Sequence, residues 1–484
     1  MAGIGFELKK LFSKKGILQS VKAFGYATVI CSGPMLLGVL LLLGLMFLCT
    51  VSGIATMKRE LLICMITYTL LASILTTSFF SLPLTRYIAD MLYTENKKAI
   101  LPSFWGSCSV MMPLGSILYG IFLLISGATL LQGMFLFIFF NELIITWNAM
   151  SYLTAIKDYK GIFTSYLVSI LTIFIVGWIL VLFKAPVIES LLFSVTVGYG
   201  VMVIWDIILL HRYFPKSNLS AFTFFKWIDL FCPLAFSGLF INIGMFLHLV
   251  IIWASDIGIR VHGLFYGAPE HDVPALIAFM TTLITTVNFV VSVEVNFYPK
   301  YRNHYSLYND KGTIGDIIQA EKEMLDVLKT ETFYTSLKQL LCTAGFIAAG
   351  GFLFDILPLG FNEMMRGYFR ILAVGYGLYA IGNMIFLILL YFTDYKGALV
   401  VSGIFASGSV VLTLISLLLP PVYYGFGFLI ASLLFVITGI IRLDYFTKRL
   451  PYYILAVQPL TEEDKSGRFT RLGAFLENKL EGEE

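Results

Sequence analysis

The chain has 484 residues, of which 58% are hydrophobic and only 13% are charged, and its formal net charge is +3. A soluble domain carries about twice this share of charged residues, so the composition excludes an ordinary soluble protein. Continuous apolar runs of about 20 residues also argue against a β-barrel, whose strands alternate apolar and polar residues. The sequence therefore predicts an all-α polytopic membrane protein.

The chain opens with a short basic segment, residues 1–24, which begins MAGIGFELKKLFSKKGILQS. Apolar side chains cluster on one helical face among several lysines, which is typical of a helix lying on anionic lipid. We expect it to lie on the cytoplasmic face of the bilayer or against a partner. A basic terminus that only follows the positive-inside rule is the alternative. The candidate surface residues are Phe6, Lys9, Lys10, Lys14 and Lys15.

Apolar length predicts about 12 transmembrane helices. They are expected at 25–50, 61–85, 100–126, 132–156, 161–183, 187–210, 231–253, 274–298, 338–356, 368–392, 397–419 and 422–441.

The distribution of basic residues predicts the orientation of these spans. With the N-terminus in the cytoplasm, 27 of the 33 Lys and Arg residues fall on the cytoplasmic side. This bias is the positive-inside pattern of multi-pass membrane proteins. Both termini are therefore expected in the cytoplasm, and the location is the bacterial cytoplasmic (inner) membrane.

A short repeat indicates an internal duplication. The sequence Asp-Tyr-Lys-Gly occurs at 158–161 and again at 394–397, each time between the fourth and fifth span of a half. Two weaker matches have offsets of 205 and 215 residues, against 236 here, and the increase follows longer loops in the second half. We interpret the chain as two parallel six-helix halves; chance matching in apolar sequence is the alternative.

This reading divides the chain into four parts. The segment 1–24 precedes an N-terminal six-helix lobe at 25–215, and a C-terminal six-helix lobe follows at 216–445. The second lobe carries a charged, amphipathic cytoplasmic helix as an insertion near 315–335. Residues 446–484 form a cytoplasmic tail.

Known catalytic and nucleotide-binding motifs are absent. We find no P-loop, no DxD pair, no HExxH and no G-x-S-x-G. We therefore expect a transporter and not an enzyme, with no cofactor, no metal and no nucleic-acid partner.

Polar residues at membrane depth are the remaining functional signal, because they are costly there and often line transport pathways. They are candidates for a transport cavity or for ion coupling. Local hydrogen bonding between helices is the competing explanation, above all for the asparagines and the histidine. The candidates are Glu142, Asn148, Asn242, His248, Asn288, Glu294 and Asn383.

Twelve spans in two parallel halves without an ATP site resemble the multidrug/oligosaccharidyl-lipid/polysaccharide flippase superfamily. The opening MAGIGFELKKL is similar to the start of the PelG family, and FYPKYRNHY at 297–305 resembles a cytoplasmic loop of that family. The resemblance implies export of an N-acetylgalactosamine-rich biofilm polysaccharide through a cavity between the lobes. It also implies a cytoplasmic glycosyltransferase, PelF, and the membrane partners PelD and PelE.

Other functions stay open at this point. The chain could be a flippase for lipid-linked oligosaccharide or a cation-coupled antiporter, which would depend on a buried acid. It could instead be a scaffold that recruits the synthase and conducts nothing. A membrane glycosyltransferase is a weaker alternative, since the longest outer loop, near 254–273, is short for such a site.

Overall fold

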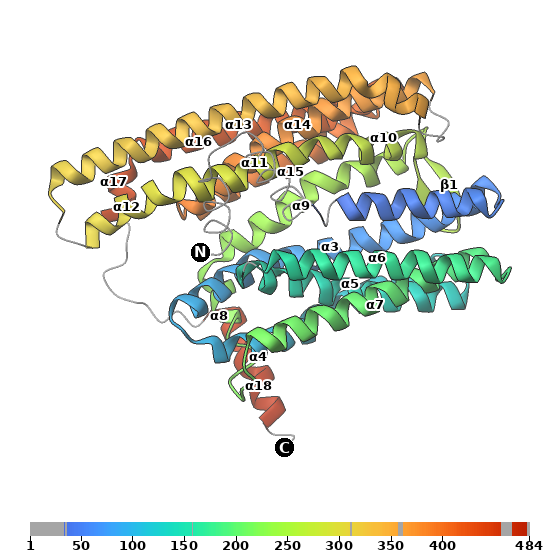
Figure 1. The fold of residues 1–484 in the computed structure, drawn as a ribbon, viewed down its shortest axis with the longest axis horizontal. Coiled ribbons are helices and arrows are strands. Elements are labelled where there is room, and N and C mark those ends of the chain that lie inside the picture. Colours follow the sequence, from blue (N-terminus) through green and yellow to red (C-terminus); the bar gives the residue numbers. More distant parts are fainter. Residues whose placement is uncertain are drawn as a thin grey trace, which may run out of the picture. The chain divides into compact units, whose positions relative to one another are not determined.

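The structure is a computed structural model that describes residue 33 and residues 36–156, 158–309, 312–356, 362–455 and 467–481 (Figure 1). Within these residues, ten helices are long and apolar enough to cross a membrane, and Leu36–Val51 is a shorter apolar helix. The predicted span at 338–356 lies in the second half of a longer helix, so each predicted span coincides with a helix wherever it is described. The opening segment with Phe6, Lys9, Lys10, Lys14 and Lys15 lies outside the described residues.

The described spanning helices have these bounds: α3 Thr56–Tyr93, α4 Ile100–Ile125, α5 Leu130–Ile156, α6 Tyr159–Leu182, α7 Val187–Tyr213, α9 Cys232–Trp253, α14 Glu363–Tyr391, α15 Tyr395–Ser416 and α16 Phe426–Thr447. The remaining span, Pro269–Tyr308, is a series of shorter segments. They are α10 Pro269–Phe279, η2 Met280–Thr282, α11 Leu283–Val291, the π-helical turn η3 Ser292–Phe297, and α12 Tyr298–Asn309.

The described chain packs as two compact units. The N-terminal unit comprises Pro34–Pro269 and also Thr461–Glu484, and the C-terminal unit comprises Glu270–Leu460. Packing therefore places α9 with the helices of the first half, whereas the repeat in the sequence put the boundary at 215/216. The two six-helix halves remain a prediction about the duplication.

Helix α9 belongs to the N-terminal unit because it packs closely on α3. Gly238 allows this approach, since a Cβ there would lie 2.7 Å from the carbonyl oxygen of Ser78. The rings of Phe79 and Phe236 meet edge to face one turn away, with centroids 5.4 Å apart. Small residues at such crossings are the usual basis of helix packing in membranes.

The outer end of the N-terminal unit carries a small antiparallel hairpin, β1 Ile259–His262 and β2 Phe265–Gly267. Its turn packs on the α4–α5 loop, where Leu264 N donates to Ser126 O at 2.8 Å. Gly263 has a φ of +54° at this contact, and an added Cβ would collide with the same carbonyl. The hairpin is a minor addition to an otherwise helical fold.

The C-terminal tail folds back on the N-terminal unit at its cytoplasmic end. Helix α18, Arg468–Glu481, packs on α8, Phe225–Leu230. Asp229 accepts hydrogen bonds from the backbone nitrogens of Phe469 (3.2 Å) and Thr470 (2.7 Å) and from the Thr470 hydroxyl. A carboxylate at a helix N-terminus satisfies its unpaired N–H groups. Part of the predicted tail is therefore a docked helix.

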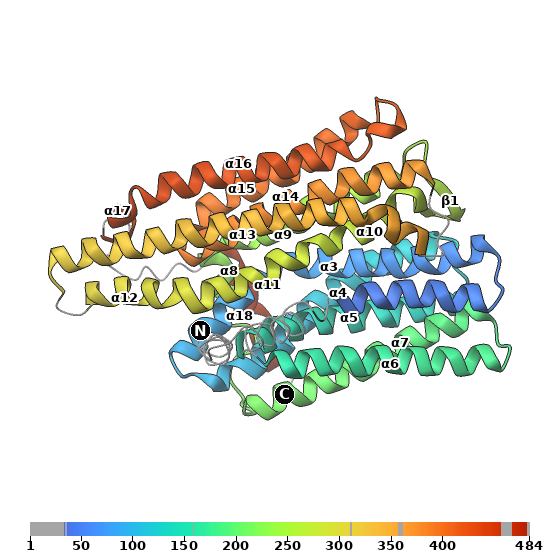
Figure 2. The same cartoon turned by 45° about the horizontal axis from the view of Figure 1, so that its top comes forward.

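In the C-terminal unit, the predicted insertion at 315–335 is continuous with the span that follows it. Helix α13 runs without a break from Ile314 to Ile356, 43 residues. At about 1.5 Å per residue it is roughly 65 Å long, about twice the thickness of the hydrocarbon core. Figures 1 and 2 show α12 and α11 running beside it. Lys300 on α12 binds Glu323 on α13 at 2.7 Å, which ties the two helices together at the cytoplasmic end.

The repeated Asp-Tyr-Lys-Gly sequence has the same local structure in both places. Asp158 and Asp394 are the N-caps of α6 and α15, and each accepts from the backbone N–H three residues later at 3.0 Å. That residue is Gly161 or Gly397, where a Cβ would collide with the capping carboxylate. The motif is therefore a helix start that requires aspartate and glycine together.

Candidate functional site

Glu142 lies in the middle of α5 and faces α7. Its side chain is half-buried, and its Oε2 is buried without a hydrogen-bond partner among the described residues. Gly200 on α7 leaves room for it, since a Cβ at position 200 would lie 3.1 Å from Oε1. A carboxylate in this position is costly unless a proton, a cation or a polar substrate satisfies it. Glu142 is thus the acidic candidate that the helix packing leaves unsatisfied.

Asn148, further along α5, is held against α4 through its amide nitrogen, whereas its buried Oδ1 has no hydrogen-bond partner among the described residues. Its side chain is 2% exposed. Its Nδ2 donates to the Ser107 hydroxyl at 2.7 Å and approaches Cys108 Sγ at 3.2 Å, both on α4. Such bonds across helices favour a structural role in joining α4 to α5.

The two candidates on α9 also lie against protein. Asn242 donates from Nδ2 to Gly238 O, one turn earlier in the same helix, at 3.0 Å. His248 is completely buried in the N-terminal unit. His248 is therefore enclosed by protein, whereas Asn242 is half-buried and bonded within its own helix.

In the C-terminal unit, Asn288 belongs to a row of polar contacts between the Pro269–Tyr308 span and α13. Its Nδ2 donates to the Thr335 hydroxyl, and its Oδ1 accepts from Lys338 Nζ at 2.8 Å. One turn towards the cytoplasm, Glu331 accepts from Ser292 and from Asn296, the latter at 2.7 Å. We call this row the α13 polar ladder; its α13 members are Glu331, Thr335, Lys338, Gln339 and Thr343.

Gln339 forms the outer part of the α13 polar ladder. It is completely buried. Its Oε1 accepts from the backbone nitrogen of Thr285 (3.2 Å) and from the Thr285 hydroxyl (2.6 Å). Its Nε2 donates to Thr281 O at 3.0 Å and to the Thr343 hydroxyl at 3.2 Å. One side chain thus satisfies groups on η2, α11 and α13.

The backbone beside the ladder is irregular. Ser292–Phe297 forms a π-helical turn that includes Glu294. Such turns insert a residue into a helix, change which side chains face the neighbour, and occur often at functional sites. Asn383 lies half-buried on α14 in the same unit. Asn288 and Glu294 therefore lie on the same irregular span, and Asn288 contacts the α13 polar ladder.

Lys338, Glu331 and Gln339 were missed by reasoning from the sequence. Lys338 was counted with the cytoplasmic loop, and Glu331 was assigned to a separate amphipathic helix. Their spacing contains the missing signal: on a continuous helix, positions 331, 335, 339 and 343 follow a four-residue repeat along one face, with 338 beside them. A helix assumed to break before residue 338 hides that face.

Replacing Gln339 by leucine is expected to lower the free energy of unfolding by about 2 kcal/mol, because buried donors and acceptors on Thr281 and Thr285 would lose their partner. Thermal unfolding of the purified chain in detergent measures this. Gln319→Leu is the matched control, since Gln319 is exposed on the same helix, and we expect less than about 0.5 kcal/mol for it. Equal effects of the two substitutions would contradict the ladder's contribution.

A pocket opens at the outer end of the N-terminal unit. Its volume is about 430 Å³, and the outer ends of α3, α5 and α7 line it together with β1. Its polar lining residues are Lys58, Thr129, Gln132, Glu189 and His262. Gln132 Nε2 donates to Glu189 Oε1 at 2.8 Å, so the acid is held in place by the wall. The pocket can hold one or two sugar-sized polar groups on the extracytoplasmic side.

Solved structures share this arrangement of helices. The chain is similar to an outward-facing multidrug resistance MATE family transporter of the MOP superfamily, with 13% identity, a TM-score of 0.59, and coverage of 93% of this chain and 99% of that one. A Vibrio cholerae MATE transporter gives 12% identity, a TM-score of 0.58, and coverage of 91% and 100%. A MATE protein in the straight conformation has 14% sequence identity and a TM-score of 0.55, and the match covers 93% of this chain and 100% of that one. At these identities the likeness shows the fold: a MATE-like, two-lobed helical membrane protein.

The sequence profile of a family described as "PelG: Putative exopolysaccharide Exporter (EPS-E)" matches residues 1–455. The chain belongs to this family, and it is therefore a multi-pass transporter of the cytoplasmic membrane and not an enzyme. No curated protein sequence matches the chain. The predicted fold class, the family resemblance and the exclusion of enzymatic activity are confirmed.

Proposed function

We propose that this exporter moves an N-acetylgalactosamine-rich exopolysaccharide from the cytoplasm to the outside. The observation that carries the proposal is the family match over residues 1–455. It is supported by polar groups placed at membrane depth, since a polymer rich in hydroxyl and amide groups needs hydrogen-bonding partners to cross an apolar layer.

Two groups of residues are proposed to serve the polymer. Glu142 is an acidic group of the N-terminal unit, and one of its carboxylate oxygens has no hydrogen-bond partner among the described residues. In the C-terminal unit, Lys338 is exposed although it binds Asn288. Each presents a charged group that a passing sugar amide or hydroxyl can bind and release. Asn148, which bonds to α4 through its amide nitrogen, and Gln339, whose amide is bonded at both ends, are proposed to hold the framework.

The driving force is proposed to come from chain growth on the cytoplasmic side. The sequence has no nucleotide-binding motif, so the protein does not supply energy from ATP by itself. A cytoplasmic glycosyltransferase, PelF, would extend the polymer and push it through. Ion coupling through Glu142 is the alternative source of energy.

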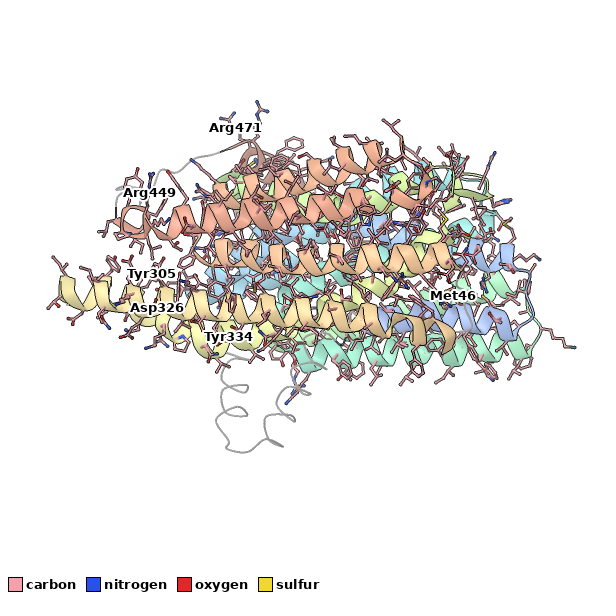
Figure 3. All side chains as sticks on the ribbon, turned by 90° about the horizontal axis from the view of Figure 1, so that it is seen from above. Met46, Tyr305, Asp326, Tyr334, Arg449 and Arg471 are labelled. Atoms are coloured by element: carbon pink, nitrogen blue, oxygen red, sulfur yellow. The ribbon has the colours of Figure 1, made fainter. Side chains whose placement is uncertain are left out.

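The α12–α13 hairpin is the proposed docking surface for these partners. It extends well beyond the thickness of the hydrocarbon core and carries charged side chains such as Asp326, which Figure 3 shows on α13. Asp326 is exposed. PelF is proposed to bind this hairpin, and PelD and PelE to hold the assembly in the membrane together with the basic opening segment.

A cation-coupled antiporter is the second candidate. The observation in its favour is the combination of a MATE-like fold with the unsatisfied acid Glu142. An antiporter would work without a glycosyltransferase, whereas the exporter would not. A lipid-linked oligosaccharide flippase and a non-conducting scaffold are the further alternatives that the same experiment separates.

The test is the amount of galactosamine-containing polymer inside and outside cells that lack the gene. The strain is complemented with the natural chain, with Glu142→Gln, or with a form lacking residues 2–15, after equal membrane levels have been verified. We expect deletion to abolish external polymer and the natural chain to restore it.

Each outcome separates the alternatives. Unchanged external polymer in the deletion strain would overturn the proposal and favour the antiporter. Loss of export with Glu142→Gln would argue against a pure scaffold. Normal export with Glu142→Gln, together with loss when residues 2–15 are removed, would remove Glu142 from the mechanism and favour partner docking.

A further inference from the structure

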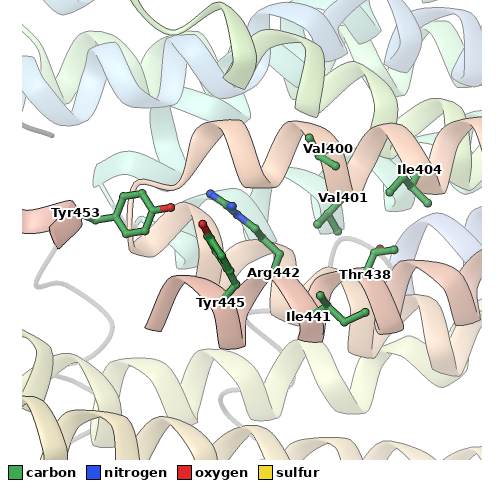
Figure 4. Close-up of a pocket in the computed structure, with 8 residues that line it drawn as sticks. All are labelled: Val400, Val401, Ile404, Thr438, Ile441, Arg442, Tyr445 and Tyr453. Carbon is green, nitrogen blue, oxygen red and sulfur yellow. The ribbon is translucent and has the colours of Figure 1, made fainter. Parts of the chain in front are cut away.

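A second pocket lies in the C-terminal unit, on the face formed by α15, α16 and α17, Leu450–Leu455. Its volume is about 400 Å³. Figure 4 shows its two ends: the guanidinium of Arg442 and the hydroxyls of Tyr445 and Tyr453 converge at one end, and aliphatic side chains form the other. The aliphatic lining residues are Val400, Val401, Ile404 and Ile441.

The polar end lies at the cytoplasmic end of the helices. Arg442 is held there by Asp394, the N-cap of α15, through two bonds of 2.6 and 2.7 Å. A guanidinium has five N–H donors, so these two bonds leave donors for a further acceptor. The side chain of Arg442 is 26% exposed, which keeps it accessible from the groove.

The charge around the polar end is positive. Arg449 lies over the Tyr445 ring, 4.3 Å from its centroid. Lys448 pairs with Asp444 at 2.7 Å, and Lys396 is exposed at the start of α15. Together with Arg442 these residues give four cations against two carboxylates, so two positive charges remain for an anion.

The apolar end faces outwards along the spanning helices. Val400 is 60% exposed and Ile441 is 64% exposed. Both lie inside predicted spans, where exposed aliphatic side chains meet lipid. The groove thus joins a cationic, hydroxyl-bearing end at the membrane interface to an aliphatic channel at membrane depth. The cationic end can bind a lipid phosphate, and the aliphatic end can hold an acyl chain.

We propose that this groove binds an anionic phospholipid of the cytoplasmic leaflet, with its phosphate at Arg442 and Tyr453 and one acyl chain along Val400, Ile404 and Ile441. Basic pockets between membrane helices on the cytoplasmic side bind anionic lipid headgroups by this combination of charges. The lipid would brace α15 against α16 beside the Asp394 cap.

The test is native mass spectrometry of the purified full chain titrated with phosphatidylglycerol or with the zwitterionic phosphatidylcholine. We expect phosphatidylglycerol to be retained at least about fivefold more strongly, in line with one basic group near an anionic lipid. Equal retention of the two lipids would overturn the proposal. Competition by soluble glycerol phosphate would also overturn it, because an acyl chain would then be unnecessary.

Two matched pairs of variants locate the site. Val400→Trp fills the groove, whereas Val411→Trp alters an exposed valine of the same helix outside it. Tyr453→Phe removes a hydroxyl from the polar end, and Tyr452→Phe is its neighbouring control. We expect Val400→Trp to reduce phosphatidylglycerol retention to the level of phosphatidylcholine and Tyr453→Phe to weaken it about fivefold, with both controls unchanged. Equal effects within either pair would contradict the site.

A phosphatidylglycerol carrying a photoreactive diazirine in one acyl chain supplies a measurement that is independent of variant stability. We expect labelled peptides from α15 and α16. Labelling spread evenly over all spanning helices would mean ordinary annular lipid and would overturn the proposal.

Discussion

Asp394→Ala is expected to lower the free energy of unfolding by about 3 kcal/mol, whereas Asp158→Ala should lower it by about 1 kcal/mol. Both substitutions remove an N-cap worth about 1 kcal/mol. Asp394, 5% exposed, also holds Arg442 through two short bonds. Its loss leaves a partly buried guanidinium unpaired, which costs about 2 kcal/mol more, below the range for fully buried pairs because Arg442 is partly exposed.

The first copy of the motif provides the control. There the second partner of Asp158 is the neutral hydroxyl of Tyr213, at 3.0 Å and in an exposed position. Asp394→Asn separates the two contributions, since the amide oxygen can still cap α15 but cannot pair as an anion with Arg442. Thermal unfolding of the purified variants in detergent measures all three. If Asp158→Ala and Asp394→Ala destabilise the chain equally, the ion pair contributes nothing.

Glu142→Gln is expected to reduce secreted polymer by about tenfold or more at an equal membrane level of the protein, the effect of losing one hydrogen bond to a charged group. The substitution keeps the size of the side chain and its place beside Gly200. It removes the only feature that the proposed role needs, which is a carboxylate able to take a proton, a cation or a sugar donor. The measurement is external galactosamine-containing polymer in the complemented strain.

The same variant should unfold at the same temperature as the natural chain or slightly above it, because a neutral amide is easier to bury than a carboxylate. This separates a lost function from a lost fold. Glu363→Gln is the control, since Glu363 has a side chain that is 88% exposed and should leave export unchanged. Normal secretion by Glu142→Gln would show that the unsatisfied acid plays no part in transport.

The sequence by itself predicted the spans and their orientation. Hydrophobic length and the positions of Lys and Arg act locally, and each helix must satisfy its own backbone in the membrane, so these features can be predicted without knowing which helices meet. The caps at Asp158 and Asp394 are local too, since the bond to the N–H of Gly161 or Gly397 spans only three residues, but from the sequence we interpreted the motif only as a sign of duplication.

Only the tertiary structure decided which polar residues have partners. Glu142 and Asn148 look alike in sequence, as polar residues in one apolar helix, but α4 supplies a hydroxyl to Asn148 and α7 supplies a glycine beside Glu142. Lys338 stood at the first position of a predicted span, but its partner Asn288 became evident only when α13 proved continuous. The packing of α9 on α3 could not be predicted from the sequence either. Hydropathy measures how apolar a segment is, whereas these contacts depend on which helix faces meet, and that is settled by packing between segments far apart in the chain.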